Sequence, residues 1–135
     1  MPRLAELFFK TAIVFLIVGI AIGLQMSISG VHNVTGAHAH INLLGWVTSA
    51  IFGAYYALNP RKAEGRLPMA HYGIYTAGVA VMIVGLYFLL QGNAAMEPVV
   101  ATGSIFTLVG VLSFAVVVFG KARAGSRATG AMPAE

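Results

Sequence analysis

The sequence contains few charged residues and no cysteine. Charged residues make up 9% of its 135 residues, whereas soluble domains usually carry about 25%. Hydrophobic residues make up 59%, so the chain lacks the polar surface that a water-soluble protein of this size requires. The absence of cysteine excludes disulfides, thiolate metal sites and covalent c-type haem attachment. The composition therefore predicts an integral membrane protein.

Among the charged residues, acidic residues are the scarcer kind. The four acidic residues are Glu6, Glu64, Glu97 and Glu135. Each lies outside the long apolar stretches or at one of their ends, whereas a proton or cation pump usually places a carboxylate within the membrane. This pattern argues against an ion-coupled transporter.

Four apolar stretches are long enough to cross a bilayer, which takes about 20 residues. They predict an all-α, polytopic protein with transmembrane helices at about 7–28, 38–58, 71–90 and 99–119. The alternating polarity of a membrane barrel is absent. Because three more spans follow the first, we interpret it as a retained helix and not as a signal peptide. Residues 1–121 then form one four-helix module, and 122–135 are predicted to be a disordered cytoplasmic tail.

The basic residues predict the topology. They precede the first span, separate the second from the third, or follow the fourth. The positive-inside rule therefore places both termini and the 61–66 loop in the cytoplasm. We expect a multi-pass protein of the bacterial inner (cytoplasmic) membrane, with the 29–37 loop facing the periplasm. The concentration of basic residues on the predicted cytoplasmic side also explains the net charge of +4, so nucleic-acid binding is not predicted.

Histidines gather where the second stretch begins, as His-Ala-His at His38 and His40. On an α-helix, residues two apart are separated by about 200°, so these two side chains must face different neighbours and cannot close around one metal. The face of His38 is expected to form a groove of small residues, and that of His40 an apolar wall. A planar macrocycle needs both, and neutral imidazole is a common axial ligand of haem iron. The predicted cofactor-binding residues are His38, His40, Asn42, Gly45, Ser49 and Gly53.

A closed ring of identical subunits satisfies this geometry, since His40 of one subunit can face His38 of the next. Several alternatives stay open. The histidines can be polar residues at the membrane interface, and His32 can join His38 and His40 of several subunits in a periplasmic copper or zinc site. The chain can also be an accessory subunit without a cofactor that packs through glycine stripes such as Gly19-x-x-x-Gly23.

One further histidine, His71, stands at the start of the third predicted span. At the cytoplasmic end it would lie a membrane thickness from His38 and His40. We therefore interpret it as an interfacial residue that does not share their site.

The segment "HAHINLLGWVTSAIFGAYYALNP", about a sixth of the chain, resembles the haem-ligating helices of the haem–copper oxidase superfamily. One such helix carries a histidine, an asparagine two residues later, a tyrosine pair and a proline. Another carries a His-x-His pair that serves two haems. The matching residues here are His38, His40, Asn42, Tyr55, Tyr56 and Pro60.

The resemblance extends to architecture, because the catalytic subunit of that superfamily has twelve helices in three arcs of four. A single four-helix arc with histidines on its second helix resembles one third of that fold and implies a homotrimer. The adjacent His-His pair and the histidine–tyrosine motif of the copper site are missing here. What the resemblance implies is therefore b-type haem binding. Two imidazoles per iron would serve electron transfer with an outside donor or acceptor, and an open position would bind O₂, NO or CO.

Overall fold

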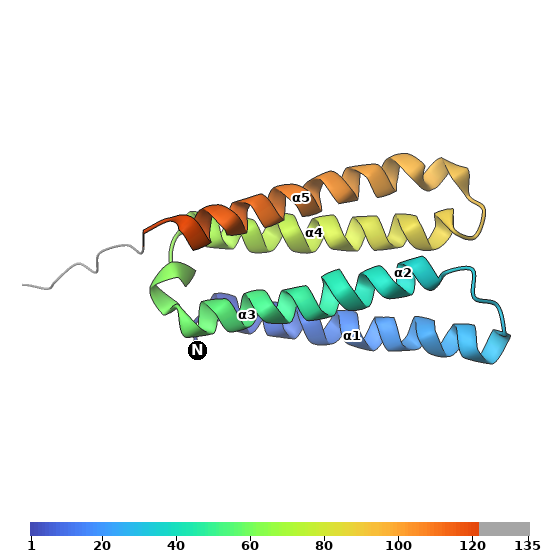
Figure 1. The fold of residues 1–135 in the computed structure, drawn as a ribbon, viewed down its shortest axis with the longest axis horizontal. Coiled ribbons are helices and arrows are strands. Elements are labelled where there is room, and N and C mark those ends of the chain that lie inside the picture. The colour runs from blue at the N-terminus through green and yellow to red at the C-terminus, as the bar shows by residue number, and fades with distance from the viewer. Residues whose placement is uncertain (122–135) are drawn as a thin grey trace, which may run out of the picture.

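The computed structural model describes residues 1–121, and the predicted tail at 122–135 lies outside the described residues. The described chain is all-helical. Four helices are long and apolar enough to cross a membrane: Arg3–Ser29, Thr35–Leu58, Arg66–Leu89 and Ala94–Phe119. They run up and down side by side, so that the N-terminus and the end of the last helix lie at the same end of the bundle (Figure 1).

The four spans contain α-helical, π-helical and 3₁₀-helical segments. The first span is α1 (Arg3–Ser29) and the third span is α4 (Arg66–Leu89). The second is made of α2 (Thr35–His40), a π-helical segment (Ile41–Thr48) and α3 (Ser49–Leu58). The fourth is α5 (Glu97–Phe119), preceded by a 3₁₀ turn at Ala94–Met96, and another 3₁₀ turn at Pro60–Ala63 follows α3.

Each span starts earlier than the hydrophobic pattern predicts. The third span, α4, begins at Arg66 and not at His71. Pro68 lies in the first turn of α4. Proline is tolerated there because the backbone N–H that it lacks would have no partner within the helix. His71 therefore lies more than a turn inside the helix.

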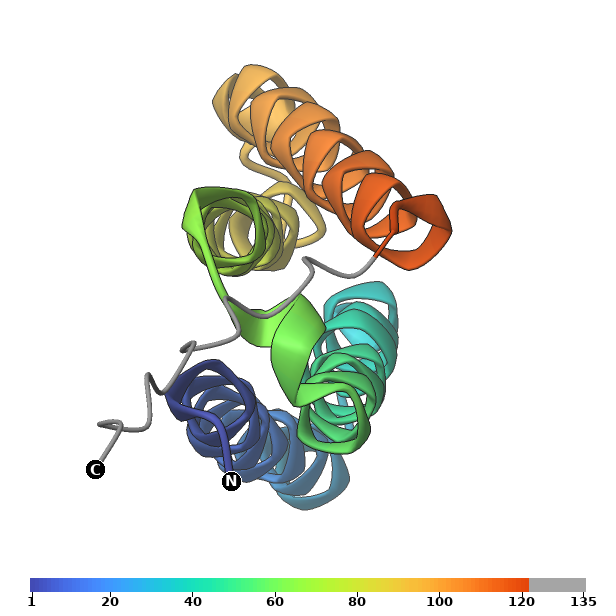
Figure 2. The same ribbon diagram turned by 90° about the vertical axis from the view of Figure 1, so that its left-hand side faces the viewer.

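The helices form two pairs, α1 with the α2–α3 span and α4 with α5 (Figure 2). Glycines bring α4 and α5 close together along their length. A Cβ atom on Gly78 would lie 2.5 Å from the backbone nitrogen of Thr107, and one on Gly103 would overlap the backbone of Met82. Gly110 packs in the same way against Tyr75. Close backbone approach through small residues is the usual way that membrane helices associate.

The π-helical segment Ile41–Thr48 directly follows His40. A π-helix bonds each N–H five residues back and so widens the helical turn. The hydroxyl of Thr48 donates to the carbonyl oxygen of Leu43 at 2.8 Å. The carbonyl oxygen of Leu44 accepts a 2.9 Å hydrogen bond from Tyr75 of α4. This bond joins the widened turn to the other helix pair.

At the other end of the bundle, Lys62 joins the 3₁₀ turn to the end of α5. Its ammonium group donates to the carbonyl oxygens of Val117 at 3.1 Å and Val118 at 2.6 Å. The last carbonyls of a helix lack partners within the helix and carry partial negative charge. Lys62 therefore caps α5 and holds the loop before α4 against it.

Candidate functional site

His38 lies on α2 and turns toward α1. Its Nδ1 atom lies 2.9 Å from the carbonyl oxygen of Gly19. A carbonyl oxygen can only accept a hydrogen bond, so we assign the proton to Nδ1, which leaves the lone pair on Nε2. Asn42 donates from Nδ2 to the carbonyl oxygen of His38 at 2.8 Å and also contacts Gly19. The ring of His38 is thus oriented by backbone and amide groups.

His40 has the same hydrogen-bond arrangement on a different side of the helix. Its Nδ1 atom lies 2.8 Å from the carbonyl oxygen of Gly36, one turn earlier, so its proton is also assigned to Nδ1. The side chain is exposed, as are those of Leu43, Val47 and Ile51 beyond it. The two histidines therefore face different surroundings, as their two-residue spacing predicts. His38 faces the neighbouring helix, and His40 the outer surface of the chain.

The predicted groove of small residues packs against α1 of the same chain. A Cβ atom on Gly45 would lie 2.7 Å from the ring of Phe15, and one on Gly53 would lie 3.3 Å from Phe8. Ser49 is fully buried, with its hydroxyl 3.5 Å from the carbonyl oxygen of Leu44. The structure gives these residues a packing role in the single chain, and their contact with a cofactor stays a prediction.

The Gly19-x-x-x-Gly23 motif of α1 lies opposite this groove. A Cβ atom on Gly23 would lie 2.8 Å from Cε1 of His38, and one on Gly19 would lie 2.7 Å from the amide of Asn42. The motif thus provides the space that His38 and Asn42 occupy. This is helix packing of the ordinary kind, with the difference that polar side chains fill the space.

His32, in the loop after α1, is exposed, and its Nδ1 atom lies 3.1 Å from the carbonyl oxygen of Gly30. Its Nε2 atom therefore also keeps the lone pair. Among residues 1–121, no three histidine or acidic side chains are grouped closely enough to hold a metal ion. A copper or zinc site that joins His32 to histidines of several subunits stays a prediction.

His71 was predicted to be an interfacial residue, but it is fully buried between the helices. Its Nδ1 atom shares a 3.0 Å hydrogen bond with the hydroxyl of Tyr56. Its Nε2 atom is buried and has no partner among the described residues. The rings of Phe52, Phe8 and Phe114 surround it at centroid distances of 4.7, 5.1 and 5.2 Å.

The hydrophobic pattern did not predict the pairing of His71 with Tyr56, because the apolar stretch that marks the third span begins only at His71. An earlier helix start at Arg66 would have shown His71 one turn before Tyr75 on the buried face of α4. The pair lies apart from the His-Ala-His segment. His71 contacts Phe8 and His38 contacts Gly19, which are separated on α1 by about 16 Å, at 1.5 Å per residue. His71 therefore does not share a site with His38.

Comparisons with known proteins found no match to any protein-family model, curated protein or solved structure.

Proposed function

We propose that this chain is a membrane protein that binds b-type haem between subunits, with His38 and His40 as axial ligands. The observation that carries the proposal is their shared hydrogen-bond pattern. Each Nδ1–H donates to a backbone carbonyl, which leaves Nε2 to coordinate iron. Histidine ligands of metals almost always donate their other N–H in this way, because the bond sets the tautomer and the ring orientation.

The residues around the histidines fit such a group in part. The exposed apolar surface beside His40, formed by Leu43, Val47 and Ile51, suits the edge of a macrocycle. The groove beside His38 is occupied by α1. In one chain the side chain of His40 therefore points outward. The second axial ligand of the iron then has to come from another subunit. This supports a closed ring and, with the resemblance to one third of the oxidase fold, a homotrimer.

In this proposal the chain's own residues hold and shield the site. The carbonyl oxygens of Gly19 and Gly36 orient the two imidazoles, and Asn42 supports the turn that carries His38. The neighbouring apolar side chains exclude water. Haem bound there would supply one-electron transfer, and an open iron position would bind O₂, NO or CO. Oxygen reduction and proton pumping form no part of the proposal.

The proposed topology follows from the basic residues. Both termini and the 61–66 loop lie in the cytoplasm of a bacterium, and the chain spans its inner membrane. Figure 1 shows α2 at the end of the bundle opposite that loop. The histidines would then lie near the periplasmic surface, within reach of an electron donor or acceptor on that side.

The first test is an absorbance spectrum of the protein purified in mild detergent from cells supplied with haem, oxidised and then reduced with dithionite. We expect the sharp reduced α-band of a b-type cytochrome, and each of His38→Ala and His40→Ala should abolish or shift it. His32→Ala is the matched control and should leave the band unchanged. A colourless protein that takes up no haem on reconstitution contradicts the proposal. A spectral change on adding CO or NO would reveal an open iron position.

Metal analysis of the same samples separates the alternatives. Bound copper or zinc that is lost in His32→Ala would favour the periplasmic metal site. A protein with neither haem nor metal would favour an accessory subunit. Native mass spectrometry tests the assembly, since a monomer that keeps its haem rules out ligation across subunits.

A further inference from the structure

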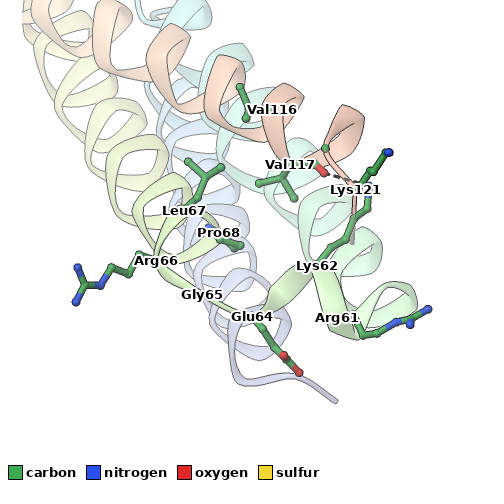
Figure 3. A pocket seen from close by; sticks show the side chains of 11 residues that line it. Arg61, Lys62, Glu64, Gly65, Arg66, Leu67, Pro68, Val116, Val117 and Lys121 are labelled. Carbon is green, nitrogen blue, oxygen red and sulfur yellow. Dashed lines mark hydrogen bonds between the residues drawn. The ribbon is translucent and has the colours of Figure 1, made fainter. Parts of the chain in front are cut away.

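An open hollow of about 550 Å³ lies at the end of the bundle that holds the N-terminus, between the loop before α4 and the last turn of α5 (Figure 3). The side chains of Arg61, Lys62, Arg66 and Lys121 line it, and Glu64 is the only carboxylate that lines it within residues 1–121. The hollow therefore has four cationic side chains against one anionic side chain. This balance favours an anionic occupant.

The same hollow has an apolar wall. Leu67 and Val116 line it with 43% and 59% of their surfaces exposed, and the buried Pro68 and Val117 lie beside them. Leu67 is in the first turn of α4 and Val116 in the last turn of α5, so this wall lies where two apolar helices reach the membrane surface. A free anion would use the charges but leave the wall exposed. An occupant with a charged head and an apolar chain would use both.

Hydrogen bonds from one lysine hold the loop that lines this hollow in place. Lys62 fixes the loop to the carbonyl oxygens of Val117 and Val118. By contrast, Arg61, Arg66 and Lys121 form no ion pair or side-chain hydrogen bond within residues 1–121, and Figure 3 shows their charged ends turned outward around the rim. Long cationic side chains of this kind can lay their apolar stems along an apolar surface and keep the charged head at its polar edge.

We propose that this hollow binds an anionic phospholipid, with its phosphodiester headgroup at the rim formed by Arg66 and Lys121 and an acyl chain along Leu67 and Val116. Basic pockets between membrane helices bind anionic headgroups in this way. The site is separate from His38 and His40, because α2, which carries them, lies toward the other end of the bundle (Figure 1).

The test measures binding of phosphatidylglycerol and of phosphatidylcholine to the detergent-purified full chain by native mass spectrometry. Phosphatidylglycerol should bind more tightly. Each of Arg66→Gln and Lys121→Gln should weaken its binding about fivefold, as expected for about 1 kcal/mol per cation near anionic lipid. Arg3→Gln is the matched control, because Arg3 is the first residue of α1, which starts at the same end of the bundle (Figure 1), and does not line the hollow. It should change binding less than the other two variants.

Three results would overturn the proposal. Equal losses in Arg3→Gln and Arg66→Gln would mean general attraction to a basic surface. Equal binding of the two lipids would mean that the headgroup charge is not recognised. Displacement of the lipid by millimolar inorganic phosphate would mean that the hollow binds a free anion and that its apolar wall plays no part. Thermal unfolding of each lipid-free variant checks that the fold is intact.

Discussion

Nδ1 of His38 lies 2.9 Å from the carbonyl oxygen of Gly19, so one hydrogen bond joins the first two membrane spans at the His-Ala-His segment. Gly23, one turn farther along α1, leaves the space in which the imidazole sits. α1 therefore helps to set the orientation of this histidine. If His38 binds iron, the two glycines of α1 are part of what positions the ligand.

Gly23→Leu should displace the ring of His38, because even the Cβ atom would lie 2.8 Å from Cε1. We expect the reduced α-band to be lost or shifted, together with a lower unfolding temperature. Gly73→Leu is the control, since nothing lies within 4 Å of a Cβ atom at that exposed position. Absorbance spectroscopy and thermal unfolding in detergent check both variants. A normal spectrum in folded Gly23→Leu protein would contradict the proposed role of His38.

Tyr56→Phe should destabilise the fold by about 1 to 3 kcal/mol, because it leaves Nδ1 of His71 buried without a partner. Tyr55→Phe is the matched control, since the hydroxyl of Tyr55 makes no hydrogen bond among residues 1–121. The free energy of unfolding should show coupling between Tyr56→Phe and His71→Phe in a double-mutant cycle. Additive effects of the two changes would mean that the bond contributes nothing.

His71→Ala should leave the haem spectrum unchanged in whatever protein stays folded. The reason is distance, since the α1 residues that contact His71 and His38 are about 16 Å apart. The reduced absorbance spectrum, normalised to folded protein, measures this. Loss of the α-band in folded His71→Ala protein would place His71 in the haem site and refute the separation described above.

Gly103→Ala should separate α4 from α5, because its Cβ atom would overlap the backbone of Met82, which cannot move aside as a flexible side chain can. Overpacking of this kind typically costs about 1 to 3 kcal/mol. Gly73→Ala adds the same methyl group on an open face and should change stability by about 1 kcal/mol at most. Thermal unfolding of the two variants should differ clearly, and similar unfolding temperatures would contradict the close packing.

Lys62→Met should weaken the junction between the 3₁₀ turn and α5. It removes two hydrogen bonds from a charged donor to the carbonyl oxygens of Val117 and Val118, and we expect a loss of about 1 to 2 kcal/mol. Arg61→Met, at the exposed neighbouring position, should have a smaller effect. Proteolysis of the loop in detergent offers a second measurement, because the released turn should be cleaved faster in Lys62→Met.

Part of the site could be predicted from the sequence. The spacing of His38 and His40 is local and helical, so their divergence follows from helix geometry alone. The identity of the neighbour that fills each face does not follow. The small residues beside His38 predicted a groove open to a cofactor, and α1 fills this groove in the single chain. Burial of His71 depends on where α4 starts, and the apolar stretch that predicted the third span began only at His71, five residues after the observed start at Arg66.

The sequence by itself determined that the chain has four helices able to span a membrane. Hydrophobic length is a property of each segment, and a bilayer requires only about 20 apolar residues per helix. Only the tertiary structure decided which helices pair, which glycines approach which backbones, and which histidine is buried with Tyr56. The physical reason is that lipid tails are as apolar as leucine, so composition does not distinguish a face that meets lipid from one that meets another helix.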